Sequence, residues 1–294
     1  MGNLKIILMG CIILMGTSSV SYGEVSEKTM ESISRINKVG PYIGLVVPNS
    51  FEMAPLLQSN SFAADQRFPY LDFAGRRFRI GKLENEKIIL VMTGLGMRYG
   101  NGPDDELALE SNGDYTRRIG YLKFSKYNNV SKNEKSSDNL LNNAWYQPEE
   151  IFPVNGVPEV RQHAFWVSVD KRYFAVSRKL EGMTLEGCIN ATTCLPRAPV
   201  VVRVRKGSSA NAFIDNAAYR QFLNSKFNIT AIDMESAAVA LVCRQQSTPF
   251  IAFRALSDLA GGGSAESNEA SVFASLAAQN AVTVVAKFIS LLLS

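Results

Sequence analysis

The sequence of 294 residues predicts an α/β sandwich, and two features of the chain indicate this class. Short apolar runs rich in β-branched residues recur along the chain, which is typical of strands buried on both faces of a sheet. Longer apolar stretches over residues 235–246 and 266–293 predict helices that alternate with them. Hydrophobic residues make up 46% of the chain, enough for a sizeable core. The predicted strands are 42–47, 87–93, 198–205, 229–232 and 249–256.

Polar, aromatic and glycine residues gather just after the ends of these predicted strands. Open α/β sheets bind ligands at the carboxyl ends of their strands. We therefore expect these positions to converge on one cleft. They are Glu52, the Gly94–Gly96 turn, Phe213, Glu235 and Asp258.

The stretch TAIDMESAAVALV, residues 230–242, is mostly apolar yet carries Asp233 and Glu235 near its start. Burying a carboxylate without a partner costs several kcal/mol, so the pair needs an explanation. Acidic residues in the first turn of a helix complement its dipole, which is one interpretation. The other is a ligand site that needs a rigidly held carboxylate. The other strand-end residues favour a site.

The N-terminal stretch predicts a secretory signal peptide over residues 1–23. It combines Lys5 with the apolar run Ile6–Met15 and small residues before the expected cleavage point. The apolar run is shorter than the ~20 residues that a membrane span needs. We expect an extracellular or vacuolar protein that does not bind membranes, with the apolar C-terminal stretch packed as an amphipathic helix.

Secretion changes the interpretation of the cysteines and of the Asn-X-Ser/Thr motifs. In an oxidising compartment, Cys188 and Cys194 are expected to form a disulfide, while Cys243 is expected to be a buried thiol. Candidate glycosylation sites are Asn129, Asn190 and Asn228, and Asn228 is the weakest of them because it adjoins a predicted core strand.

Charge and histidine content exclude several function classes. The net charge is +4, and no Lys/Arg stripe with interleaved aromatic residues supports binding to nucleic acid. His163 is the single histidine and is expected on a strand face, so histidine-based triads and multi-histidine metal sites are not supported. We expect no metal and no organic cofactor.

Two C-terminal motifs, AIDMESAAVA (231–240) and PFIAFRALSDLAG (249–261), resemble the nucleoside phosphorylase / methylthioadenosine nucleosidase superfamily. The signal peptide and the sequence stretches VVPNSFEM and SDLAGGGS are similar to those of its plant branch. That branch includes bark and vegetative storage proteins and cytokinin-riboside phosphorylases. The resemblance covers about residues 40–97 and 145–294. It implies a single domain over residues 24–294, with 98–150 irregular. The implied fold is a three-layer sandwich whose mixed central sheet is flanked by helices.

The resemblance implies cleavage of a purine–ribose bond and assigns roles to residues of this chain. Asp258 matches the general acid that protonates the leaving base, and Ser257 orients it. Glu235 matches the residue that holds the ribose hydroxyls and favours the positive charge of the ribosyl transition state. The remaining assignments are Phe213 stacking on the base, Met234 beneath the sugar, and Glu52 with Arg254 placing the nucleophilic water. In that interpretation Asp233 has no role towards the substrate, and it either caps the start of the helix or forms an ion pair at the surface.

One part of the family pattern is missing. In the family, the strand that ends at MTGLG leads through a helix to another central strand and a GxAG turn. Here MTGLGM runs directly into RYGNGPDDE, so a βα-sized segment of roughly 30 residues or more is absent at Met97/Arg98. A splice variant and a faulty gene model would both produce this junction. Losing a central strand would leave two sheet edges unpaired and a slot in the core.

Two functions remain open at this point. One is cleavage of adenosine-like or cytokinin ribosides, by phosphorolysis with phosphate as co-substrate or by hydrolysis, in a homodimer or larger assembly. The other is a storage or wound-induced protein with little catalysis. The retained acidic residues favour the enzyme, and the junction favours loss of activity. We expect weak or no activity.

Overall fold

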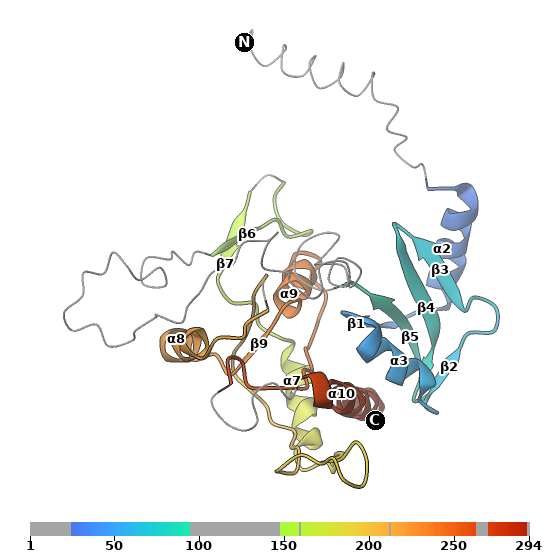
Figure 1. Ribbon diagram of the computed structural model, residues 1–294. Coiled ribbons are helices and arrows are strands. Elements are labelled where there is room, and N and C mark those ends of the chain that lie inside the picture. Colours follow the sequence, from blue (N-terminus) through green and yellow to red (C-terminus); the bar gives the residue numbers. More distant parts are fainter. Residues whose placement is uncertain (1–24, 95–147, 159, 212, 263–269, 293–294) are drawn as a thin grey trace, which may run out of the picture.

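The computed structural model describes residues 25–94, 148–158, 160–211, 213–262 and 270–292 (Figure 1). The predicted signal peptide, the Met97/Arg98 junction, Asn129 and the predicted irregular stretch up to residue 147 lie outside the described residues.

A mixed five-stranded sheet forms the N-terminal half of the fold, in the order β1-β5-β4-β2 with β3 also paired to β4. β5 runs parallel to β1, whereas β4 is antiparallel to its three neighbours. The strands predicted at 42–47 and 87–93 are confirmed. The strands are β1 (Ile43–Val47), β2 (Phe62–Ala64), β3 (Tyr70–Phe73), β4 (Arg76–Leu83) and β5 (Glu86–Met92).

Two tight turns fix the register of this sheet. Ala74-Gly75 joins β3 to β4, and Glu84-Asn85 joins β4 to β5. All four residues have positive φ, between 49° and 72°. Two-residue hairpin loops of this kind match the right-handed twist of the strands.

Helices α3 (Ser50–Gln58) and α10 (Ala270–Leu292) pack against the N-terminal sheet (Figure 1). The Asn49 side chain caps α3 by accepting a hydrogen bond from the N–H of Phe51. Helix α2 (Glu27–Val39) lies beside β3. The shared core consists of Met53, Leu56, Leu83, Ile88, Leu90, Val282, Ala286 and Ile289.

Helix α10 is long and apolar enough to cross a membrane, since its 21 residues from Val272 to Leu292 have a mean hydropathy of 1.5. A core helix of a soluble protein meets the same criterion. In this fold α10 packs on two sides. One side contacts the N-terminal sheet, and the other, through Val284, Phe288 and Leu292, contacts the C-terminal half.

The C-terminal half contains two small sheets and several helices around α10. β6 pairs with β7 in antiparallel fashion, and β8 pairs with β9 in parallel. Its elements are β6 (Glu149–Ile151), β7 (Gln162–Ala164), α7 (Lys171–Val176), the 3₁₀ helix η3 (Ser177–Leu180), β8 (Gly207–Ser209), α8 (Ala217–Phe227), β9 (Ala231–Asp233) and α9 (Ser236–Gln245).

The α/β class and the mixed sheet flanked by helices are confirmed, but two of the predicted strands are not regular strands. Residues 198–205 and 249–256 form no ladder. Among the described residues, 199–205 and 251–256 make no backbone–backbone hydrogen bond, although the N–H of Arg203 bonds the Glu181 side chain. Val201, Ile251 and Phe253 pack against α10 and η3. Because the inner face of each segment is packed while its backbone lacks a partner, the central sheet is interrupted here.

A large cavity marks the interruption. It has a volume of about 1520 Å³ and is lined by both extended segments, by β8 and β9, and by part of α10. Ligand pockets usually measure ~300–1,000 Å³, so this space exceeds what a small ligand fills. Val200, Val202 and Val204 alternate along its wall and are 72%, 65% and 40% exposed. The slot expected from a missing central strand is thus present.

The predicted disulfide between Cys188 and Cys194 is also present. Cys243 lies on α9 as a half-buried free thiol, and burial raises its pKa. His163 lies on β7 with its side chain about half exposed, as expected for a strand-face residue.

Candidate functional site

Arg254 is held between two carboxylates at the edge of the cavity. Its Nε donates to Asp233 Oδ2 at 2.6 Å, and its second guanidinium nitrogen, Nη2, donates to Glu235 Oε2 at 2.6 Å. The side chains of Asp233 and Glu235 are only 15% and 11% exposed. Charge-assisted bonds of this length are among the strongest in proteins, so the three groups form one rigid unit.

Asp233 also organises the start of α9. Its Oδ1 accepts hydrogen bonds from the N–H groups of Glu235 and Ser236 at 3.1 and 3.0 Å, and from the hydroxyl of Ser209. Both interpretations of the acidic pair therefore apply. Asp233 accepts the hydrogen bonds from the N–H groups at the start of α9. The Glu235 carboxylate does not cap this helix.

Glu52, in the first turn of α3, lies within electrostatic range of this unit. Burial raises the pKa of Glu52 and nearby Glu235 adds to the rise, while Arg254 and backbone N–H groups oppose it. Its Oε2 atom is buried and accepts no hydrogen bond from the described residues. A buried carboxylate oxygen without a donor is costly in the free protein, and it is a natural contact for a ligand hydroxyl or water.

Ser257 and Asp258 form a second polar pair on the loop that follows 249–256. The Ser257 hydroxyl donates to Asp258 Oδ1 at 2.7 Å. Just beyond, Arg220 of α8 donates to the carbonyls of Ala260 and Gly262. Gly261 has φ +74°, and a Cβ there would lie 1.9 Å from the backbone nitrogen of Ala217. The loop that carries Asp258 is therefore pinned to the start of α8.

The predicted site residues are brought together only in part. Glu52, Glu235 and Arg254 interact, and Arg254 and Ser257 both line the cavity. Met234 lies half-buried beside Glu235, whereas Phe213 is 68% exposed. Their roles towards base and sugar stay predictions.

The hydrogen bonds of Ser209 and Ser236 to the Asp233–Arg254 pair were not predicted from the sequence. Ser236 Oγ lies 3.1 Å from Arg254 Nε, and Ser209 binds Asp233. A usable signal existed in the sequence, because a cation within an apolar run such as 249–256 requires buried partners. Among the described residues, no group of three or more His, Cys, Asp and Glu side chains is placed to hold a metal ion.

Asp233→Asn is expected to destabilise the protein at pH 7 by roughly 2–3 kcal/mol, because it leaves Arg254 with one fewer buried charge partner. Burial alone would raise the pKa of Asp233, but Arg254 and the hydrogen bonds from Ser209 and Ser236 hold it below its ordinary value of 3.8. The contribution of Asp233 is thus fully present above that pH and is lost as pH falls through the lower, folded-state value.

Thermal melts of the wild type and Asp233→Asn across pH 7 to pH 3 measure this difference. It should shrink below pH 3.8. Asp72→Asn, which breaks an exposed pair with Arg77 on the N-terminal sheet, is the matched control and should change little. A pH-independent difference for Asp233→Asn would contradict the assignment.

Comparison with known proteins adds to this geometry. Residues 159–290 match the Phosphorylase superfamily. The chain is 27% identical over 286 positions to bark storage protein B of Populus deltoides, covering 84% of this chain and 88% of that protein. Because 84% of 294 residues is fewer than 286, roughly forty alignment positions face gaps in this chain. Gaps of that total length agree with the predicted absence of a βα-sized segment.

Nucleosidases are also similar to this chain. A 5'-methylthioadenosine/S-adenosylhomocysteine nucleosidase of Geobacillus sp. is 38% identical over 84 residues, covering 28% of this chain and 35% of that protein. A solved nucleosidase of the same type from S. pneumoniae aligns with a TM-score of 0.48 and 16% identity, covering 86% of this chain and all of that one. Over residues 159–290 this chain is similar to the phosphorylase superfamily, and over most of its length it is similar to the plant bark storage proteins.

Proposed function

We propose that this protein binds purine nucleosides and cleaves their N-glycosidic bond slowly. The observation that carries the proposal is the buried, unpartnered oxygen of Glu52 beside the unit formed by Arg254, Asp233 and Glu235. A storage role alone needs no such cluster of ionised groups, because exposed charges serve solubility equally well.

The chemistry of the reaction fits these residues. As the bond breaks, positive charge develops on the ribosyl group, and a rigid carboxylate such as Glu235 stabilises it without reorganisation. Glu52 and Arg254 together can orient a water or a phosphate oxygen, since one accepts and the other donates hydrogen bonds. Asp258, oriented by Ser257, protonates the leaving base. The incomplete sheet beside Arg254 is the reason to expect slow turnover.

The substrate class follows from the relatives. The nucleosidases that resemble this chain are named for methylthioadenosine and S-adenosylhomocysteine, which supports adenosine-like nucleosides. Cytokinin ribosides carry the same purine–ribose bond and form part of the proposed range. We also propose a homodimer or larger homo-oligomer, which light scattering of the purified protein measures directly.

The test is release of adenine from adenosine by purified residues 24–294, with and without phosphate. Release that requires phosphate identifies a phosphorylase, and release without it identifies a hydrolase. Adenosine binding should be detected by calorimetry even where turnover is slow. Neither release nor binding, for any purine nucleoside tried, would contradict the proposal.

A storage protein with little catalysis is the second candidate. Its support is the 27% identity to bark storage protein B together with the unpaired segments 198–205 and 249–256. The two candidates differ in rate. Turnover at ordinary enzyme rates, about 1–10³ s⁻¹, would exclude the storage role as the main function.

Glu52→Gln is expected to stabilise the free protein while lowering its activity. Because the pKa of Glu52 is raised above its ordinary value of 4.5, its contribution to stability is present below that pH and is lost as pH rises through the folded-state value. At pH 7, removing the buried charge should raise the free energy of unfolding by roughly 1 kcal/mol. The effect should vanish near pH 4.

Urea unfolding and adenine release, measured on the same preparation, check this prediction. Glu27→Gln, on the exposed first turn of α2, is the matched control. A variant that is both destabilised at pH 7 and fully active would show that Glu52 is a structural residue.

A further inference from the structure

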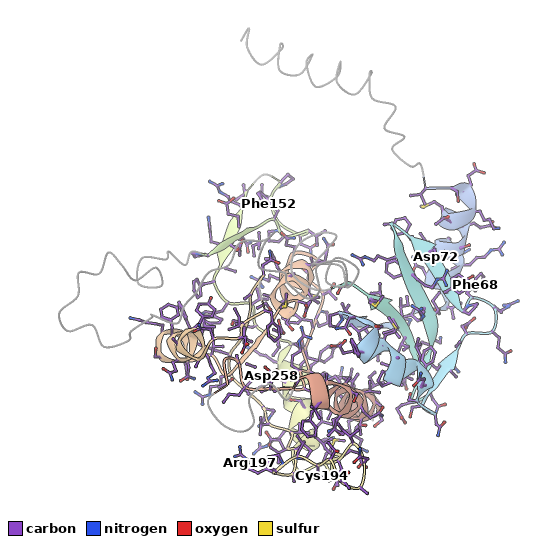
Figure 2. All side chains as sticks on the ribbon, viewed as in Figure 1. Phe68, Asp72, Phe152, Cys194, Arg197 and Asp258 are labelled. Atoms are coloured by element: carbon purple, nitrogen blue, oxygen red, sulfur yellow. A yellow bond between two sulfur atoms is a disulfide. The ribbon has the colours of Figure 1, made fainter. Side chains whose placement is uncertain are left out.

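The disulfide between Cys188 and Cys194 closes a short loop that carries the motif Asn190-Ala191-Thr192. Residues 188–192 are all exposed. Figure 2 places Cys194 at the edge of the molecule, away from the N-terminal sheet. The start of this loop is tied to α10, because Glu186 and Asn280 exchange two hydrogen bonds of 3.0 and 2.9 Å. The motif is thus exposed to solvent, while the residues that precede it are held in place by hydrogen bonds to α10.

The local geometry leaves the amide nitrogen of Asn190 available. Its Oδ1 accepts three hydrogen bonds, from the Thr192 N–H and hydroxyl at 3.0 Å each and from the Thr193 N–H at 2.8 Å. Among the described residues, the Nδ2 atom makes no hydrogen bond. The threonine that defines the motif therefore contacts the carboxamide of its own asparagine, and the nitrogen that a glycan would occupy points to no protein partner.

The motif at Asn228 differs in its backbone conformation and in the hydrogen-bond partner of its threonine. Asn228 is the C-cap of α8 in the left-handed conformation, with φ 58°. Ile229 is buried in the core that α8 forms. The Thr230 hydroxyl donates to the carbonyl of Lys206 at 3.0 Å rather than to Asn228. Asn228 thus ends α8, and Thr230 is hydrogen-bonded to Lys206 just before β9 begins.

We propose that Asn190 is an N-glycosylation site and that the chain matures in an oxidising secretory compartment. The asparagine Nδ2 would attack the anomeric carbon of a lipid-diphosphate-linked oligosaccharide. A C–N bond forms, the lipid diphosphate leaves with the electron pair of the broken C–O bond, and the amide proton passes to a base of the transferase. The disulfide supports the same compartment, because such bonds persist where the environment is oxidising.

The experiment uses the full chain expressed in mammalian cells, with the medium and the cell lysate collected separately. Peptide-N-glycosidase releases the glycan and leaves aspartate in place of the modified asparagine. Mass spectrometry of the tryptic peptide 180–197, which holds Asn190 and both cysteines, is the readout. Secreted protein with aspartate at this position after treatment, and with Cys188 linked to Cys194, is the expected result.

Matched variants separate the motif from general effects on folding. Asn190→Gln and Thr192→Ala should abolish the modification of this loop, whereas Thr192→Ser and Asn228→Gln should keep it. An unmodified Asn190 in secreted protein would overturn the proposal. So would a chain retained in the cytosol with free thiols at both cysteines, or a glycan at Asn228 with none at Asn190.

Discussion

Replacing Asp258 by asparagine is expected to lower the rate of nucleoside cleavage by about 10²–10⁴-fold, the range typical for loss of a general acid. The amide keeps the size of the side chain and can still accept the 2.7 Å hydrogen bond from Ser257, but it has no acidic proton to give. Adenosine binding should weaken much less, because the substitution leaves unchanged the proposed contacts of Glu235 with the sugar and of Phe213 with the base. Turnover at high enzyme concentration, with calorimetry for binding, measures both quantities.

Asp72→Asn is again the matched control, because the same change is made far from the candidate site. Figure 2 shows Asp72 on the N-terminal sheet and Asp258 in the C-terminal half. An Asp258→Asn variant that turns over substrate at the wild-type rate would remove Asp258 from the mechanism. Thermal melts of both variants show whether each is folded under the assay conditions, so that a loss of activity caused by unfolding is recognised.

Inserting a family segment between Met97 and Arg98 is expected to raise both stability and activity strongly. The segment to use is the part of bark storage protein B that has no counterpart in this chain. A strand placed between 198–205 and 249–256 would supply partners for their backbone groups and would cover the exposed side chains of Val200 and Val202, whose full burial is worth about 1.5–3 kcal/mol each. We expect the free energy of unfolding to rise by several kcal/mol and adenine release to rise by at least about tenfold.

An insert of the same composition in scrambled order is the control, since it adds length without strand pattern. The midpoint of thermal unfolding and the rate of adenine release are the two readouts. Equal behaviour of the native and scrambled inserts would mean that the interrupted sheet does not limit this protein.

Local sequence pattern was sufficient for part of the fold. The strands at 42–47 and 87–93, the helices over 235–246 and 266–293, and the Cys188–Cys194 disulfide are present close to their predicted bounds. β4 was not predicted, although residues 77–80 alternate between basic and apolar side chains as a half-buried strand does.

The segments 198–205 and 249–256 show why the rest was not predictable. Their β-branched and aromatic residues favour an extended backbone, which the structure has, but a ladder also requires a neighbouring strand. That requirement is non-local. The site has the same limit, because the residue pattern could not reveal that Asp233 joins Arg254 to the start of α9.

The position of α10 between the two halves has a consequence for biosynthesis. Residues 270–292 emerge from the ribosome after every other described element, yet they complete the core over Leu83, Ile88 and Leu90. Chains fold from the N-terminus during synthesis at ~5–20 residues per second, so the N-terminal sheet waits roughly 10–40 seconds with this apolar face uncovered. A nascent chain in that state is a natural client for the chaperones of the compartment in which it is made.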